Sequence, residues 1–144
     1  MGAGSQGRRV QTFDGLGRHL IGELYGCDPA LLADLKFVST VVKRGARRAG
    51  ATPVGEFANK YEGGGGVSYI LVVKESHLSV HTWPEHSYAA VDIYTCGDHV
   101  DPWAAFDEVV RALNPKSVSV MEIRRGLLSR DAKADEEVRV AVRE

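Results

Sequence analysis

Short runs in which apolar and polar residues alternate are the commonest pattern along this chain. Alternation of this kind, rich in β-branched residues and bounded by glycine, proline or aspartate, is typical of β-strands. Residues 67–73 (VSYILVV) form the strongest example. The pattern predicts six strands, over residues 18–25, 52–60, 67–73, 77–83, 88–95 and 117–123.

Two other stretches carry apolar residues at the three- and four-residue spacing of a helix. The first begins at Asp28-Pro29, an N-cap followed by proline at the first helical position, and Gly50 is placed to end it. The second begins with the same signal at Asp101-Pro102, and Asn114-Pro115 ends it. We therefore predict one helix between each pair of signals.

The predicted order is strand, helix, four strands, helix, strand. Two helices can cover only one face of such a sheet. The fold class expected is therefore α/β (α+β): a two-layer α/β sandwich with a largely antiparallel sheet and two helices on one face. The other face would stay open to water, and a second copy of the chain is the simplest cover for it. We therefore expect a homodimer.

Titratable residues gather in the segment from Lys74 to Gly97, KESHLSVHTWPEHSYAAVDIYTCG. Its two predicted strands are joined by residues 84–87, as in a β-hairpin. Because side chains alternate between the faces of a strand, His81 and Trp83 share one face with Ser79. On the second strand a face is shared by Tyr88, Ala90, Asp92 and Tyr94. This concentration predicts an acid/base site.

Other kinds of site fit the segment less well. Zinc ligands could come from His77, His81, His86, His99 and Cys96. However, the spacing of His77 and His81 suits a helix, and no CxxC pattern is present, so we predict no metal. The glycine run 63–66 could hold phosphate, yet it leads into a strand and no GK[ST] follows. A mobile loop is the simpler interpretation.

Two polar residues also have simpler interpretations. Cys96 could serve a Cys-His hydrolase, but a cysteine at a strand end is more often a buried structural thiol. Asp92 lies on an otherwise apolar strand, where its simplest role is that of a hydrogen-bond acceptor, and it needs a partner if it is buried.

Composition excludes several classes of function. The chain of 144 residues has a formal net charge of −1, which gives no basic surface for nucleic acid or an anionic membrane. No apolar run approaches the ~20 residues of a membrane span, and the first residues lack the apolar core of a secretory signal. Two cysteines are too few for a disulfide framework, so we expect a cytoplasmic protein. Residues 1–14 and 127–144 are expected to be tails, the first mobile and the second charged.

The hairpin segment closely resembles the processing and active-site segment of the prokaryotic S-adenosylmethionine decarboxylases, small pyruvoyl-dependent enzymes of spermidine synthesis. The most specific part is ESHxxxHTWPE followed by TCG. Further matches are GLGRHL at Gly15, ELYGCD at Glu23, GVS at Gly66 and DHVDPWAAF at Asp98. The resemblance covers residues 15–126, so this range is expected to form the decarboxylase domain.

The resemblance implies a proenzyme that cleaves itself between Glu75 and Ser76. Ser76 would attack the Glu75 carbonyl to give an ester, and His81 would remove the Ser76 α-proton, with Ser68 assisting. The product would be a pyruvoyl group on the new chain end, the only cofactor expected. It would form a Schiff base with the substrate and act as an electron sink. Cys96 matches the proton donor that quenches the carbanion.

The substrate implied by the resemblance is S-adenosylmethionine. Trp83 and Glu85 match positions of the substrate pocket. Just before GVS, however, the chain has KYEGGGG where the family has an aromatic, proline-containing segment. Tyr61 could still stack on adenine, whereas Glu62 would suit a basic amino acid. The alternatives are therefore an ornithine or arginine decarboxylase of the same family, and, more remotely, an unprocessed dimeric binding module.

Overall fold

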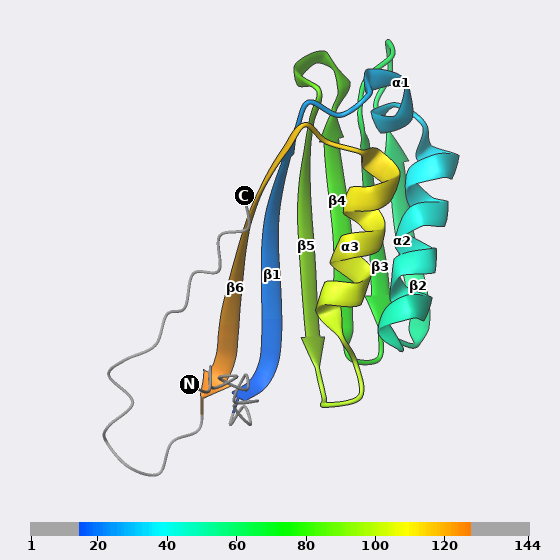
Figure 1. Ribbon diagram of the computed structural model, residues 1–144. Helices are drawn as coiled ribbons and strands as arrows, with labels where there is room; N and C mark the ends of the chain where they lie inside the picture. The colour runs from blue at the N-terminus through cyan, green and yellow to red at the C-terminus, as the bar shows by residue number, and fades with distance from the viewer. Residues whose placement is uncertain (1–14, 128–144) are drawn as a thin grey trace, which may run out of the picture.

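The computed structural model describes residues 15–127, which form one six-stranded sheet with helices on a single face (Figure 1). The elements in chain order are β1 (Gly15–Tyr25), α1 (Pro29–Leu32), α2 (Leu35–Ala49), β2 (Pro53–Lys60), β3 (Val67–Val73), β4 (Ser76–Trp83), the 3-10 helix η1 (Pro84–His86), β5 (Tyr88–Cys96), α3 (Pro102–Leu113) and β6 (Ser117–Leu127). The predicted tails lie outside the described residues, apart from Leu127, which ends β6.

The sheet is antiparallel throughout, in the order β2-β3-β4-β5-β1-β6. The predicted two-layer architecture is confirmed, with α2 and α3 side by side over one face (Figure 1). No helix among residues 15–127 is long and apolar enough to cross a membrane.

The core lies between the sheet and the helices. Alternate residues of the strands point into it, among them Leu20 and Leu78, both almost fully buried. Val42 of α2 and Phe106 of α3 meet them from the helix side. Each such side chain stabilises the fold by about 1.5–3 kcal/mol relative to its exposed state, so the alternating pattern holds the helices to this one face.

The prediction of a single helix from Asp28-Pro29 to Gly50 is wrong, because the structure has two helices there, α1 and α2. Asp28 caps the first by accepting a hydrogen bond from the amide of Ala30. Asp34 caps the second by accepting one from the amide of Phe37, so a new helix starts before the first has completed two turns. Gly50 ends this second helix with a φ of 80°, as predicted.

Four strands extend beyond their predicted ends. β1 begins three residues early, at Gly15, and β5 ends one residue late, at Cys96. β4 begins at Ser76, one residue early, because only Lys74 and Glu75 separate it from β3 and Ser76 pairs with Val73. β6 continues past Ile123 into a charged sequence, because it pairs with β1 up to Leu127. Pairing with a long neighbouring strand outweighs the local charge.

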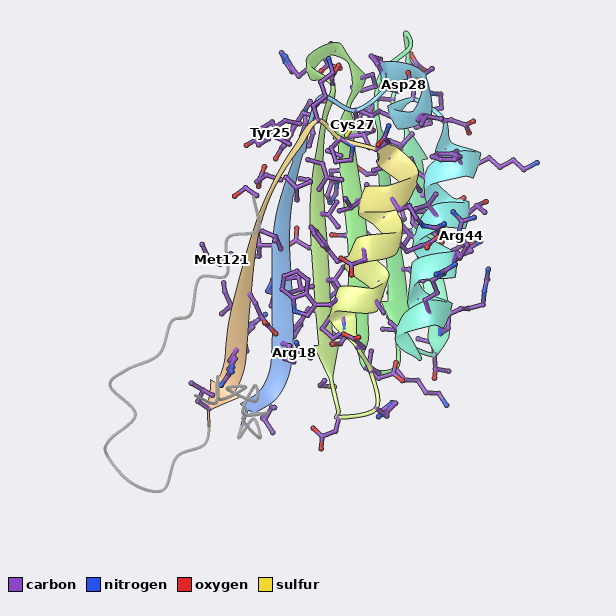
Figure 2. The ribbon with its side chains drawn as sticks, viewed as in Figure 1. Arg18, Tyr25, Cys27, Asp28, Arg44 and Met121 are labelled. Carbon is purple, nitrogen blue, oxygen red and sulfur yellow. The ribbon has the colours of Figure 1, made fainter. Side chains whose placement is uncertain are left out.

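The face of the sheet opposite the helices is uncovered in the protomer. Large apolar side chains on it are exposed: Phe57 by 63%, Val72 by 44% and Met121 by 37%. Figure 2 draws Tyr25 and Met121 on this side, directed away from the helices. This surface, the open face, also carries the polar residues of the hairpin.

Candidate active site

A pocket of about 380 Å³ lies at one end of β4 and β3. It brings together five of the residues singled out above with the glycine loop and Thr82. The lining residues are Tyr61, Gly65, Gly66, Ser68, His81, Thr82, Trp83 and Glu85. The predicted faces of the hairpin are confirmed, because Leu78, Val80 and Thr82 are buried whereas His81 and Trp83 are not.

Ser68 and His81 face each other across the β3–β4 pair. The register places them opposite one another, and the Ser68 Oγ lies 2.8 Å from the His81 Nδ1. The Tyr61 hydroxyl lies 3.4 Å from the same Ser68 oxygen. A chain of hydrogen bonds thus joins the loop residue to the histidine, and it can position the imidazole for proton transfer.

Aromatic rings extend from the pocket across the open face. Trp83 stacks on Tyr88 at 5.2 Å between ring centroids, and Tyr88 stacks on Tyr25 at 5.3 Å. The Tyr88 hydroxyl donates to the carboxylate of Glu23, which raises the pKa of the tyrosine after the larger effect of its burial. Glu62 is exposed and does not line the pocket.

The peptide bond between Glu75 and Ser76 has unusual geometry. Ser76 has a φ of 145°, a conformation that residues other than glycine rarely adopt and that costs on the order of 1–3 kcal/mol. The carbonyl oxygen of Glu75 accepts a 2.9 Å hydrogen bond from the amide of Cys96. An amide donor in this position would stabilise negative charge developing on that oxygen.

The side chain of Glu75 anchors the same peptide. Its buried carboxylate accepts hydrogen bonds from the Thr52 amide at 3.1 Å and the Thr52 hydroxyl at 3.3 Å, and it contacts the His99 Nε2 at 3.2 Å. The Thr52 amide contributes most to lowering the pKa of Glu75, against the opposing effect of burial. The residue therefore stays ionised and fixed in place.

Cys96 is exposed at the end of β5, so its interpretation as a buried structural thiol is wrong. Its neighbour Thr95 pairs with Ser76, which puts Cys96 close to the Glu75–Ser76 peptide. Both Cys27 and Cys96 are free thiols.

The structure thus divides the predicted site residues between two places. Glu75, Ser76 and Cys96 lie at one end of β4, whereas Ser68 and His81 lie toward the other end. His81 follows Ser76 by five residues along one strand, a span of about 16 Å. Within one protomer, therefore, His81 does not reach Ser76.

A second group of polar side chains surrounds Ser76, and only His19 among them lies outside the hairpin segment singled out above. The Ser76 Oγ lies 3.2 Å from the Nδ1 of His77. The ring of His77 contacts those of Tyr94 and His19, and the His19 Nε2 lies 2.9 Å from the Asp92 carboxylate. Asp92 is half-buried and has the partner that its position required. His19 lies on the strand predicted over residues 18–25, but that pattern did not indicate that its ring would lie beside His77.

Metal ligation has no support among residues 15–127, where no three His, Cys, Asp or Glu side chains are grouped as ligands of one ion. A pyruvoyl group needs no such ligands. What it requires is a serine after a cleavable peptide, a donor for the carbonyl and a nearby proton source. Ser76, the Cys96 amide and the Cys96 thiol fit these requirements.

Comparison with known proteins gives one consistent family. Residues 18–126 match the model of the family described as S-adenosylmethionine decarboxylase. An S-adenosylmethionine decarboxylase proenzyme of Pyrobaculum arsenaticum is 46% identical over 127 residues, which cover 88% of this chain and 98% of that protein. The proenzyme of the same name from Thermotoga maritima is 45% identical over 111 residues, or 77% of this chain and 85% of that one.

A solved structure agrees with these sequences. The crystal structure of the adenosylmethionine decarboxylase from Aquifex aeolicus superimposes with a TM-score of 0.75 at 30% identity, covering 82% of this chain and 97% of that one. The family model spans most of the folded residues, and the relatives match over nearly their whole lengths. The chain therefore belongs to the S-adenosylmethionine decarboxylase family.

Proposed function

We propose that this chain is a self-processing proenzyme of a pyruvoyl-dependent decarboxylase that acts on S-adenosylmethionine. The observation that carries the proposal is the geometry of the Glu75–Ser76 peptide. A serine with positive φ follows a carbonyl that already accepts a hydrogen bond from the Cys96 amide. A purely structural hairpin requires neither feature. The relatives from Pyrobaculum arsenaticum and Thermotoga maritima, which are named proenzymes of this decarboxylase, support the same reaction.

Processing begins when the Ser76 hydroxyl oxygen attacks the Glu75 carbonyl carbon. The carbonyl electron pair moves onto its oxygen, which the Cys96 amide holds. Breakage of the C–N bond then leaves an ester between Glu75 and Ser76. A base removes the Ser76 α-proton, and the main-chain α-carboxylate of Glu75 leaves as the new C-terminus of the first fragment. The resulting dehydroalanine hydrolyses to the pyruvoyl group with release of ammonia.

In turnover, the pyruvoyl carbonyl supplies an electron sink for the loss of carbon dioxide. The exposed Cys96 thiol supplies the proton that quenches the resulting carbanion, because an ordinary thiol is largely protonated at neutral pH. This role requires a free thiol, so the reducing cytosol is the compartment in which the enzyme works.

The functional unit is a homodimer in which the open faces of two copies meet. The open face exposes Phe57, Val72 and Met121, a surface that a monomer would leave in water. The distance between Ser76 and His81 supports the same assembly. A two-fold axis that crosses β4 between these residues would bring the Ser76 of one copy to the Ser68 and His81 of the other, and both sites would then be complete.

S-adenosylmethionine is favoured over ornithine or arginine by the lining of the pocket. Tyr61 contributes a ring to the pocket and is tied to Ser68, so an aromatic surface for adenine is present. The carboxylate proposed for a basic amino acid, Glu62, is not among the lining residues. Trp83 and Glu85 complete the pocket as the family resemblance requires.

Two measurements test the core of the proposal. Intact mass spectrometry should find fragments of 75 and 69 residues, the second beginning with a pyruvoyl group. The processed protein should release carbon dioxide from S-adenosylmethionine and not from ornithine, arginine or lysine. A chain that stays whole after long incubation would support a binding module instead, and release only from ornithine or arginine would reassign the substrate.

Completion of the site across the dimer can be tested separately. Ser76→Ala and His81→Ala chains should each stay whole when expressed alone. Co-expression should restore cleavage of the His81→Ala chain only, because its Ser76 meets the intact His81 of its partner. Sedimentation at low micromolar concentration should show at least a dimer. No cleavage in the mixture, or an active monomer, would contradict this assembly.

A further inference from the structure

The side chain in closest reach of the Ser76 hydroxyl is His77, which the processing scheme above does not use. The Ser76 Oγ and the His77 Nδ1 are 3.2 Å apart, within hydrogen-bond distance. His81, the histidine that the family resemblance assigns to processing, lies toward the other end of β4 and is hydrogen-bonded to Ser68. Ester formation and removal of the α-proton, the first and second steps of processing, therefore have different histidines available, His77 and His81.

We propose that His77 is the base that takes the Ser76 hydroxyl proton in the first step of self-processing, the shift of the acyl group from nitrogen to oxygen. The proposal rests on the proposed function, because it assumes that Ser76 is the residue that is converted. It divides the work between two histidines: His77 for ester formation and His81 for removal of the α-proton.

The step balances without any further reactant. The Ser76 Oγ–H proton passes to the His77 Nδ1 as the Oγ forms its bond to the Glu75 carbonyl carbon, and the carbonyl electron pair moves to the oxygen held by the Cys96 amide. When the C–N bond breaks, its electron pair takes the proton back from His77, which leaves the free amine of Ser76. The imidazole ends the step unchanged.

The surroundings of His77 suit a base. Burial is the main cause that lowers the pKa of His77, and the nearby His19 and Arg125 lower it further, while Asp92 opposes them. The imidazole is therefore neutral at pH 7, and in the Nε2–H tautomer its Nδ1 can accept the serine proton.

Neighbouring rings hold the imidazole in place. Tyr94 lies 5.9 Å from it between ring centroids at an interplanar angle of 67°, and His19 lies 6.3 Å away at 81°. His19 is itself held by Asp92, and the Arg125 guanidinium lies 4.4 Å from the centroid of Tyr94. These contacts come from β1, β5 and β6, so three strands orient the ring that faces Ser76.

The experiment separates the two steps of processing with hydroxylamine, which cleaves esters under conditions that leave amides intact. Full-length chains made by cell-free synthesis are treated with it and weighed by mass spectrometry. His81→Ala should accumulate the ester and be cut into 75- and 69-residue fragments, the second beginning with serine. The double variant His77→Asn/His81→Ala should form the labile ester about 100-fold more slowly or worse.

The choice of asparagine distinguishes a base from a structural contact. Asparagine keeps an oxygen that can accept a hydrogen bond from Ser76, but it cannot take up a proton at neutral pH. If the contact only positions the serine, His77→Asn should form the ester at the normal rate, and the proposal is overturned. His86→Ala, in the β4–β5 connection at the other end of the strand, serves as the matched control and should behave as the parent.

A pH profile in the His81→Ala background tests the proposal without any change at His77. With His81 gone, the rate of ester formation should stay constant around neutral pH. It should fall as His77 becomes protonated, at a pH below 6.5, because the pKa of His77 is lowered from its ordinary value of 6.5. The other titratable or charged groups facing His77 are His19, Asp92, Tyr94 and Arg125, so His19→Gln should shift the profile without abolishing it. A rate independent of pH from 5 to 8 would refute the proposal while leaving cleavage at Ser76 intact.

Discussion

The amide of Cys96 donates a 2.9 Å hydrogen bond to the carbonyl oxygen of Glu75. One residue thereby contributes to both stages of the proposed enzyme through different atoms. In the proposed reaction, its backbone amide stabilises the carbonyl that Ser76 attacks, and its thiol delivers a proton during turnover. Substitution of the side chain can therefore separate the two stages.

Cys96→Ala should still cleave itself, because the variant retains the amide that holds the Glu75 carbonyl. Turnover of S-adenosylmethionine should fall by about 100-fold or more, since the proton donor is lost. Mass spectrometry measures the cleavage and release of carbon dioxide measures the turnover. Full activity in the cleaved variant would show that the Cys96 thiol is not the proton donor, and Ser76→Ala provides the uncleaved, inactive control.

Tyr61→Ala should weaken binding of S-adenosylmethionine. Loss of one aromatic stack costs on the order of 1–3 kcal/mol, so KM should rise roughly 10- to 100-fold. Tyr61→Phe keeps the ring and should change KM little. Glu62→Gln should also have little effect, because Glu62 does not line the pocket. A severe loss in Glu62→Gln, with activity on ornithine or arginine, would favour the basic amino acid instead.

Gly66→Ala should destabilise the pocket end of the sheet by about 3 kcal/mol or more. A Cβ at this position would lie 1.8 Å from the carbonyl oxygen of Thr82, which is backbone and cannot move aside easily. Gly55→Ala is the matched control, since a Cβ there meets nothing within 4 Å, and its effect should stay within about 0.5 kcal/mol. Urea denaturation compares the two, and equal midpoints would contradict the close approach of Gly66 to β4.

Glu108→Gln should destabilise the helix layer at neutral pH. The Glu108 carboxylate is 2% exposed and contacts Arg44, Arg48 and Arg111. Figure 2 shows Arg44 on the helix side of the molecule. The arginines remain partly in water, so the expected loss is about 1–3 kcal/mol rather than that of a fully buried pair. The exposed Glu62→Gln should change stability by less than about 0.5 kcal/mol.

The effect of Glu108 should also depend on pH in a defined direction. Hydrogen bonding to Arg111 is the main cause that lowers the pKa of Glu108 from its ordinary 4.5. The carboxylate therefore contributes its full stability above about pH 4.5, and this contribution is lost as the pH falls through the lowered value. Urea denaturation at pH 7 and at acidic pH should show the gap between parent and variant closing. A constant gap would mean that the charge of Glu108 is not what stabilises the helices.

The layers of this fold could be predicted from the sequence because each element carries its own periodicity. The buried Leu78 and Val80 and the half-buried His81 lie on the faces that simple alternation requires. The break in the first helix was missed, although Asp34 carries the same capping signal as Asp28. In that case a long apolar pattern concealed a second N-cap.

The site was only partly predictable, for a physical reason. The motif identified Ser68, Ser76, His81 and Cys96, but their distances depend on strand register, which tertiary pairing decides. The donor to the Glu75 carbonyl is a backbone amide, and since nearly every residue carries one, the sequence cannot identify it. The contact of His77 with Ser76 occurs at a serine with positive φ, a conformation that the residue type does not predict.

The order of strands in the sheet has a consequence for the protein after cleavage. A cut after Glu75 leaves β1, β2 and β3 on one polypeptide and β4, β5 and β6 on the other. In the sheet, β1 lies between β5 and β6, so the first polypeptide is inserted into the second. The two products are interlocked and cannot part without breaking three ladders of hydrogen bonds, those of β1 with β5, β1 with β6 and β3 with β4. Once denatured, they must find each other again in a bimolecular reaction, so the mature enzyme should rebuild the sheet of each protomer at a rate that depends on concentration. In the uncut Ser76→Ala chain the sheet forms within one polypeptide, so only the assembly of two protomers should depend on concentration.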